Sequence, residues 1–427
     1  MMGDRAVDVE EPIEVSDSDE SSDFIPEQNF HHGTTRPLDA SLEDLPRKKE
    51  EQVGLTSDLH QKKYIKCFAS DLPSGQFDKF KIKFDAKPTD IDEFCKMLKE
   101  KKPIQGGPVN NIIETFKQFI KEHLGDLSID LNSVTEKAKK HFETRNKDND
   151  IEGIEKKLNF AAFNDLKREA FDKIRLSTRN VNKFYTQTIR SEEYNNDEDM
   201  LRLLSHWITA VNEFMRSCID VVRSILHPQM VKTTKGERET EQNTREIVFQ
   251  SLFTSFSKMF LLHTRPQRIT YKTLLEYYVT SEPDVLFEQT FNLSGAEPAT
   301  PLMMICEVKR DEPRLKGSRQ NHALGEMVPT KTIDQIGTEL LCECSGSYFS
   351  PGAVGILCLR SQILFLFLDI SYEHLIAIEK NMPLDNMNGR IRYTDYFDIL
   401  KPSDRLKVMD IMFYMARIQT LDFIHPF

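Results

Sequence analysis

Two short stretches decide how this chain is expected to fold: residues 282–287 read Glu-Pro-Asp-Val-Leu-Phe, and residues 305–310 read Ile-Cys-Glu-Val-Lys-Arg. Each stretch combines apolar and β-branched residues in the manner of a β-strand. Between them, residues 292–298 form a dense cluster of turn-forming residues. The pattern therefore predicts a β-hairpin that carries charged residues at one end.

The charged end of this hairpin holds side chains that are costly to bury without a reason. Side chains alternate between the two faces of a strand, so Glu307 and Lys309 point the same way. Asp284, at the start of the neighbouring strand, can lie close to both. Two carboxylates can bind a hard cation such as Mg²⁺, and a lysine can orient water or neutralise charge that develops on a phosphate. The stretch therefore predicts a metal-binding site for phosphodiester cleavage.

This arrangement resembles the PD-(D/E)XK nuclease superfamily, with Pro283, Asp284, Glu307 and Lys309 as the matching residues. The resemblance covers roughly residues 242–370. It implies a restriction-endonuclease-like α/β core and a Mg²⁺-dependent nuclease that cleaves DNA or RNA. In such an enzyme the two acids would bind the magnesium, and the lysine would activate or position water.

Two further residues stand where this family often has polar groups. Glu246 lies in the first turn of a helix expected over 244–262, where the helix dipole alone also favours an acid. Gln335 lies on a helix expected over 332–344, off its apolar stripe. Two alternatives stay open: a structural hairpin whose charges lie at the surface, and a nuclease-like fold that does not cleave.

The rest of the expected C-terminal module, residues 242–427, follows the hairpin. A polar loop over 311–329 and its flank add basic side chains that could contact a nucleic-acid backbone. These candidates are Arg310, Arg314, Lys316 and Arg319. Two buried strands over 354–359 and 363–369 and a helix over 404–418 complete the module.

The first 62 residues predict a disordered tail, because they are rich in charge and poor in aromatic residues. Residues 1–60 hold 16 acidic and 5 basic residues, so they alone carry the formal net charge of −11. The rest of the chain sums to zero. The overall acidity therefore does not argue against nucleic-acid binding by the folded part.

Within the tail, two β-branched residues precede an acidic serine run over residues 12–20. This resembles a SUMO-interacting motif, in which a short strand adds to the edge of a partner's sheet. The candidate residues are Ile13, Val15, Ser16 and Asp17. The alternative is a plain solvated acidic tail.

Residues 70–235 predict a helical bundle, with apolar residues at helical spacing over 91–101 and 109–124, for example. Over residues 108–195 the order of elements resembles the second half of a regulator of G-protein signalling (RGS) domain. The resemblance includes the turn Ile-Asp-Leu-Asn-Ser at 129–133. It implies an RGS-like helical domain that binds a G-protein alpha subunit.

The RGS resemblance is incomplete at the residues that matter for activity. Asp130 stands where the family has an asparagine that contacts the G-protein alpha subunit, and residues 177–179 contain no acid. These differences argue against strong GTPase activation. An unrelated helical bundle is the alternative.

The chain has 427 residues, an odd number of seven cysteines and no apparent secretory signal. These features favour an intracellular protein, cytoplasmic or nuclear, with reduced thiols. The most apolar stretch, residues 353–370, is interrupted by Arg360 and Gln362. It therefore predicts two buried strands rather than a membrane span.

Two functions follow from a multidomain chain with an all-α module before an α/β module. The first is metal-dependent phosphodiester hydrolysis by the nuclease-like module. The second is a signalling or adaptor role in G-protein signalling, with an RGS-like domain that binds partners and an inactive nuclease-like fold.

Overall fold

The computed structural model describes residues 64–73, 75, 77–104, 109–137, 160–189, 198–226, 235–265, 267–289, 301–311, 313 and 323–419. All of them belong to one compact unit, Lys62–Phe427. Several predicted sites lie outside the described residues. These are the tail with Ile13, Val15, Ser16 and Asp17, and the basic candidates Arg314, Lys316 and Arg319.

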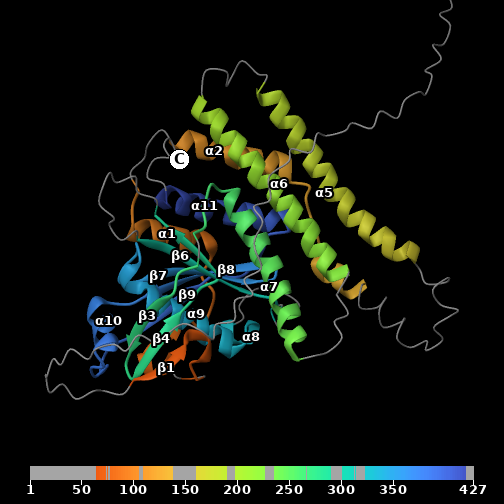
Figure 1. Ribbon diagram of the computed structural model, residues 1–427. Coiled ribbons are helices and arrows are strands. Elements are labelled where there is room, and N and C mark those ends of the chain that lie inside the picture. Colours follow the sequence, from red (N-terminus) through yellow and green to blue (C-terminus); the bar gives the residue numbers. More distant parts are fainter. Residues whose placement is uncertain are drawn as a thin grey trace, which may run out of the picture. The chain divides into compact units, whose positions relative to one another are not determined.

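A mixed seven-stranded sheet lies at the centre of this unit (Figure 1). Its order is β2 (Ile82–Phe84), β9 (Gly389–Tyr393), β8 (Gln362–Asp369), β7 (Ala353–Leu359), β6 (Leu302–Lys309) and β5 (Val285–Glu288), and β10 (Phe397–Asp398) pairs with β8. The β2–β9 and β6–β7 pairs are parallel, and the other pairs are antiparallel. The predicted hairpin is therefore confirmed as β5 and β6, and the two predicted apolar strands as β7 and β8.

A second, three-stranded sheet lies beside the first and has the order β1 (Ile65–Phe68), β4 (Tyr277–Ser281) and β3 (Thr270–Leu274). β3 and β4 form an antiparallel hairpin, and the turn between them holds Leu275 at a φ of 54°. β1 comes from a distant part of the chain and adds in parallel to β4. Residues 270–281 thus form a hairpin.

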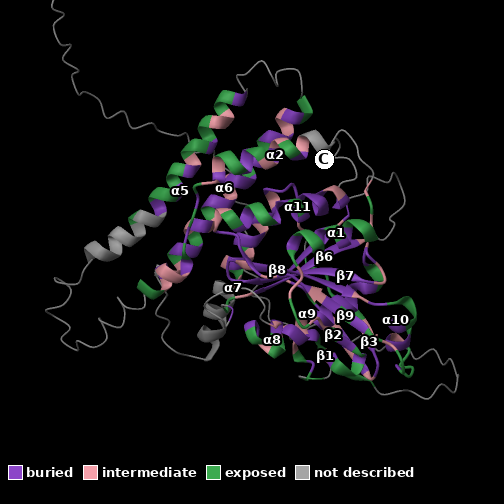
Figure 2. Ribbon diagram, turned by 180° about the vertical axis from the view of Figure 1, so that it is seen from behind, coloured by how far each residue is buried: buried purple, intermediate pink, exposed green. Residues whose placement is uncertain are grey.

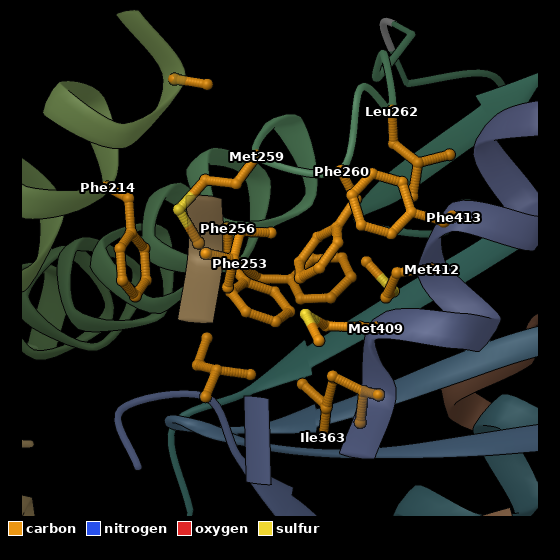
Figure 3. Packing of buried hydrophobic residues seen from close by; sticks show 14 of the residues in the cluster. Phe214, Phe253, Phe256, Met259, Phe260, Leu262, Ile363, Met409, Met412 and Phe413 are labelled. Carbon is orange, nitrogen blue, oxygen red and sulfur yellow. The ribbon is translucent and has the colours of Figure 1, made fainter. Parts of the chain in front are cut away.

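Large aromatic side chains fill the space between one face of the central sheet and the helices α6 (Glu198–Leu226), α7 (Lys235–Lys258) and α11 (Pro402–Gln419). Figure 3 shows the phenylalanines of this layer together. The ring of Phe256 lies 5.9 Å from that of Phe214 on α6 and 5.0 Å from that of Phe260, which in turn lies 5.2 Å from Phe413 on α11. These contacts join the three helices above the strands.

The opposite face of the sheet packs against α8 (Leu324–Met327), α9 (Thr330–Glu343) and α10 (Tyr372–Glu379), together with the three-stranded sheet. Strand β7 shows why both faces are covered, because every one of its residues is buried. Its Ile356 and Cys358 belong to the aromatic layer, whereas Leu357 and Leu359 belong to the layer around α9. A continuous apolar strand with alternating side chains needs cover on both sides.

The helices α1 (Ile91–Lys101) and α2 (Val109–Leu124) occupy the ranges that the sequence predicted, and α5 (Phe160–Ile189) follows. Their buried residues belong to the same hydrophobic cluster as β6, β7 and β8. Helix α7 runs through residues 235–242, where the sequence placed a domain boundary. Helices from the first predicted module thus share a core with the sheet of the second.

Asp130, whose place in the sequence resembles that of an asparagine in RGS domains, has a local structural role. Its carboxylate accepts hydrogen bonds from the backbone N–H groups of Asn132 and Ser133, each at 3.1 Å. It therefore caps the short helix over 131–137. Short 3-10 helices lie at Ala69–Asp71, Phe77–Phe80 and Cys344–Gly346. Within the described part of the chain, no helix combines the length and the apolar character needed to cross a bilayer.

Candidate active site

The antiparallel register of the hairpin brings the two predicted metal-binding acids together. Val285 pairs with Cys306, so the preceding residue, Asp284, lies opposite Glu307. The backbone N–H of Val308 donates to Asp284 Oδ2 at 2.7 Å and fixes this carboxylate at the mouth of the hairpin. The acid before β5 and the acid on β6 thus meet at one end of the sheet.

Lys309 lies between two carboxylates that come from different elements. Its ammonium group donates a hydrogen bond to Glu307 Oε1, and it lies 3.5 Å from Glu246 Oε1 on α7. The Glu307 side chain is only 2% exposed, whereas that of Lys309 is 23% exposed. The lysine therefore reaches from a buried acid towards solvent.

Gln335 extends the same cluster from α9. Its Nε2 donates to Glu307 Oε1 at 2.6 Å and to Glu339 Oε1 at 3.0 Å. The Gln335 side chain, which the sequence places off the apolar stripe of its helix, therefore points at Glu307, the buried acid of β6. All five predicted catalytic residues gather at this one place, supplied by α7, the start of β5, β6 and α9.

Two residues that hydrogen-bond to this site, Glu339 and Gln250, were not predicted from the sequence. Glu339 lies one helical turn after Gln335 and is 1% exposed. Gln250 lies one turn after Glu246, and its Nε2 donates to the backbone carbonyl of Asp284 at 2.6 Å. Residues four apart share a helix face, so the spacing from the predicted residues was a signal that could have found both.

Of the predicted nucleic-acid-binding residues, Arg310 alone falls within the described part of the chain. It is exposed and directly follows Lys309. Its guanidinium group is therefore available to solvent next to the cluster.

Burial dominates the acid–base properties of the three carboxyl groups. Desolvation raises the pKa of Glu307 well above its ordinary value, and the nearby Glu339 and Asp284 raise it further. Desolvation also raises the pKa of Asp284, although the Val308 N–H and Lys309 act against it. The pKa of Glu339 rises from 4.5 to about 7, chiefly because the side chain is buried. The cluster concentrates more negative charge than its surroundings stabilise.

Lys309 shows the opposite balance. Desolvation works to lower its pKa, but the attraction of Glu307, Glu246 and Asp284 outweighs it, and the pKa is raised. The side chain is therefore a cation at neutral pH. It can neutralise charge on a phosphate oxygen, but it cannot accept a proton in this state.

The candidate site offers buried carboxylate oxygens to a divalent cation. Oε2 of Glu307 and Oε2 of Glu339 are buried and have no hydrogen-bond partner among the described residues. A buried carboxylate oxygen without a partner is unfavourable, and a cation would satisfy it. Among those same residues, no group of three or more His, Cys, Asp or Glu side chains is placed to hold a metal. A cation at the Oε2 atoms of Glu307 and Glu339 would take its remaining ligands from water and phosphate.

Comparison of the chain with protein-family models, with curated proteins and with solved structures finds no match.

Proposed function

We propose that this protein hydrolyses phosphodiester bonds of nucleic acid in a Mg²⁺-dependent reaction of the PD-(D/E)XK type. One observation carries the proposal: Asp284, Glu307 and Lys309 converge at the end of the β5–β6 hairpin. Hydrophobic burial alone does not favour three ionisable groups at one point, whereas phosphodiester hydrolysis uses this set.

Each side chain has a role that follows from its contacts. Asp284 and Glu307 would hold the cation. Bound there, Mg²⁺ would polarise the phosphodiester and lower the pKa of a water molecule. Lys309 stays protonated and stabilises negative charge that develops on the phosphate as water attacks. Glu246 and Gln335 act on these groups: Glu246 attracts the Lys309 ammonium, and Gln335 orients the Glu307 carboxylate.

The order of elements supports a restriction-endonuclease-like core. Helix α7 precedes the antiparallel pair β5 and β6, α9 then crosses over, and β7 returns in parallel to β6. Helices α7 and α9 lie over opposite faces of the sheet, and each contributes a side chain at the end of the hairpin. Side chains from both helices therefore reach Asp284, Glu307 and Lys309, which together with Glu339 we call the acid–lysine cluster.

The test is cleavage of single- and double-stranded DNA and RNA by the full chain, with Mg²⁺ or Mn²⁺ and with EDTA. We expect metal-dependent cleavage that both Lys309→Ala and Asp284→Ala abolish. Lys331→Ala is the matched control, because Lys331 is an exposed lysine on α9 outside the cluster. The proposal fails if purified protein does not cleave, or if cleavage survives both substitutions.

A further inference from the structure

The three-stranded sheet presents an outer face that is rich in aromatic side chains. The register places Lys66, Tyr278 and Thr273 in one row across the sheet. It places Phe68, Thr280 and Tyr271 in the next row. Directly paired residues point to the same side of a sheet, and so do residues two apart on one strand. We refer to these six residues as the aromatic sheet face.

The aromatic sheet face is open, whereas most of the other side of the same sheet is covered, although Ile65 of β1 on that side is 54% exposed. Phe68 is 52% exposed and Tyr271 is 57% exposed, and exposed residues mark β1 and β3 in Figure 2. Leu274, Tyr277 and Val279 point the other way and lie in the core around α9. An alternating strand would normally place polar residues on its open side, so large rings there indicate a binding surface.

The two tyrosines are held in a defined arrangement. The rings of Tyr271 and Tyr278 lie nearly parallel, with 14° between their planes and 6.0 Å between their centres. Lys66, beside Tyr278 in the same row, is exposed and makes no ion pair with any other described residue. Aligned π faces with a free cation beside them match a ligand made of flat rings and negative charges.

The aromatic sheet face adjoins the candidate active site. Strand β4 ends at Ser281, and Asp284 follows three residues later. Four residues of fully extended chain span at most ~14 Å, so Thr280 lies within that distance of Asp284. On the neighbouring strand, Phe68 is followed by Ala69–Asp71, which packs against α9, the helix that carries Gln335. A ligand on this face can therefore reach the cluster within a few nucleotides.

We propose that the aromatic sheet face stacks the unpaired bases of single-stranded nucleic acid and leads the strand to the acid–lysine cluster. This inference rests on the proposed nuclease function and narrows its substrate to single strands or single-stranded ends. Bases in a duplex stack on one another, and their flat faces are closed to side chains. Unpaired bases can stack on Phe68 and the tyrosines, and Lys66 pairs with a phosphate.

The experiment measures binding without metal, so that no cleavage is needed. Full-length protein in EDTA is titrated into fluorescent oligothymidylate, and separately into a duplex of the same length, with fluorescence anisotropy as the readout. The variants are Phe68→Leu and Tyr271→Leu, which keep apolar area but remove the ring. Tyr271→Phe restores the ring. Tyr372→Leu is the matched control, because Tyr372 is 55% exposed on α10 and lies outside the face.

We expect wild-type protein to bind the single strand more tightly than the duplex. Each leucine variant should lose roughly five- to hundredfold in affinity for the single strand, the effect of one stacked base. Tyr271→Phe and Tyr372→Leu should bind like the wild type. The inference is overturned if the leucine variants bind oligothymidylate like the wild type, or if the duplex binds at least as tightly.

Two further outcomes separate this inference from the proposed function. Leucine variants that change the oligomeric state in sedimentation, with unchanged DNA affinity, would assign the face to contact between copies of the chain and would also overturn it. Ring-dependent binding without any metal-dependent cleavage would support the binding role of the aromatic sheet face and contradict the proposed nuclease function. Cleavage of duplex by the leucine variants at wild-type rates would support the nuclease function and contradict the binding role of this face.

Discussion

Two clusters of buried ionisable groups, one around Arg405 and one around Glu307, differ in how far their hydrogen bonds are satisfied. Around Arg405, which is 1% exposed, the guanidinium group donates to the carbonyls of Ile399, Leu124 and Leu127 at 2.6 to 2.9 Å. Burial lowers the pKa of Arg405 to about 10, so the group is still charged at neutral pH. In the acid–lysine cluster, by contrast, Glu307 and Glu339 each keep an oxygen without a partner among the described residues.

This difference in hydrogen bonding distinguishes a buried group that stabilises the fold from one that is available to a ligand. A buried charge with all its hydrogen bonds made stabilises one arrangement of the chain, and Arg405 joins α11 to the end of α2 in this way. A buried charge left partly unsatisfied destabilises the fold and is kept where a ligand completes it. The contrast can be tested by substitutions in both clusters.

The largest effect is expected at the satisfied cluster. Arg405→Met should destabilise the protein by about 3–5 kcal/mol, because it removes three buried hydrogen bonds from the guanidinium group. Chemical denaturation measures this loss. Arg223→Met is the control, since Arg223 pairs with Asp220 at the surface and should contribute about 0–1 kcal/mol. Equal losses in the two variants would contradict the structural role of Arg405.

Next comes an effect on activity without a matching loss of stability. Asp284→Asn should lower the cleavage rate by roughly a hundred- to thousandfold, the scale for one electrostatic group in an active site. Its melting temperature should stay close to that of the wild type, because the amide can replace the carboxylate as acceptor for the Val308 N–H. Asp369→Asn, in an ion-pair cluster with Lys101 and Arg390, is the control. A variant that unfolds would argue that Asp284 is structural.

A smaller effect is expected on the pH dependence of stability. The pKa of Glu339 is raised from 4.5 to about 7, so the folded state binds its proton more tightly than the unfolded state. Its favourable contribution is complete below pH 4.5 and is lost as the pH rises through about 7. The free energy of unfolding of Glu339→Gln should therefore equal that of the wild type below pH 4.5. At pH 8 it should exceed the wild-type value by on the order of 1–3 kcal/mol. Urea denaturation at both pH values measures this. An equal difference in stability between variant and wild type at both pH values would contradict the raised pKa of Glu339.

The smallest effect is expected at Gln250, which contacts only the backbone of the site. Gln250→Ala removes one hydrogen bond to the Asp284 carbonyl, which is worth about 1 kcal/mol. The free energy of unfolding should fall by about that amount, and the cleavage rate should fall by roughly fivefold, the factor that corresponds to this energy. Steady-state kinetics alongside denaturation checks this. A loss as large as that of Asp284→Asn would place Gln250 in the chemistry itself.

Much of the local structure could be predicted from the sequence, because it depends on periodicity within short segments. Strands β7 and β8 followed from an apolar run broken at Arg360 and Gln362, and α11 followed from its helical spacing. The five predicted catalytic residues followed from a resemblance to a known motif. The structure brings all five together, which the motif alone could not establish. Binding to a G-protein alpha subunit and to SUMO stays a prediction.

What could not be predicted depends on contacts between distant residues. Ile65 pairs with Tyr277, and Ile82 pairs with Gly389, although hundreds of residues separate the partners. A strand's own residues predict that it pairs, but they do not identify its partner. Arg405 gave no signal for the same reason, since its acceptors are backbone carbonyls of another helix end. The four-residue spacing from Gln335 could have pointed to Glu339, but its burial and its contact with Gln335 became known only from the structure.

The parallel pairing of β1 with β4 and of β2 with β9 has a consequence for how the protein is made. A ribosome releases β1 and β2 first, and their partner strands emerge only after most of the chain has been synthesised. Until then the backbone N–H and C=O groups of β1 and β2 lack their partner strands, while the helices between them are being synthesised. Premature termination before residue 389 leaves β2 without its neighbour, so shortened products should aggregate rather than fold into smaller stable units.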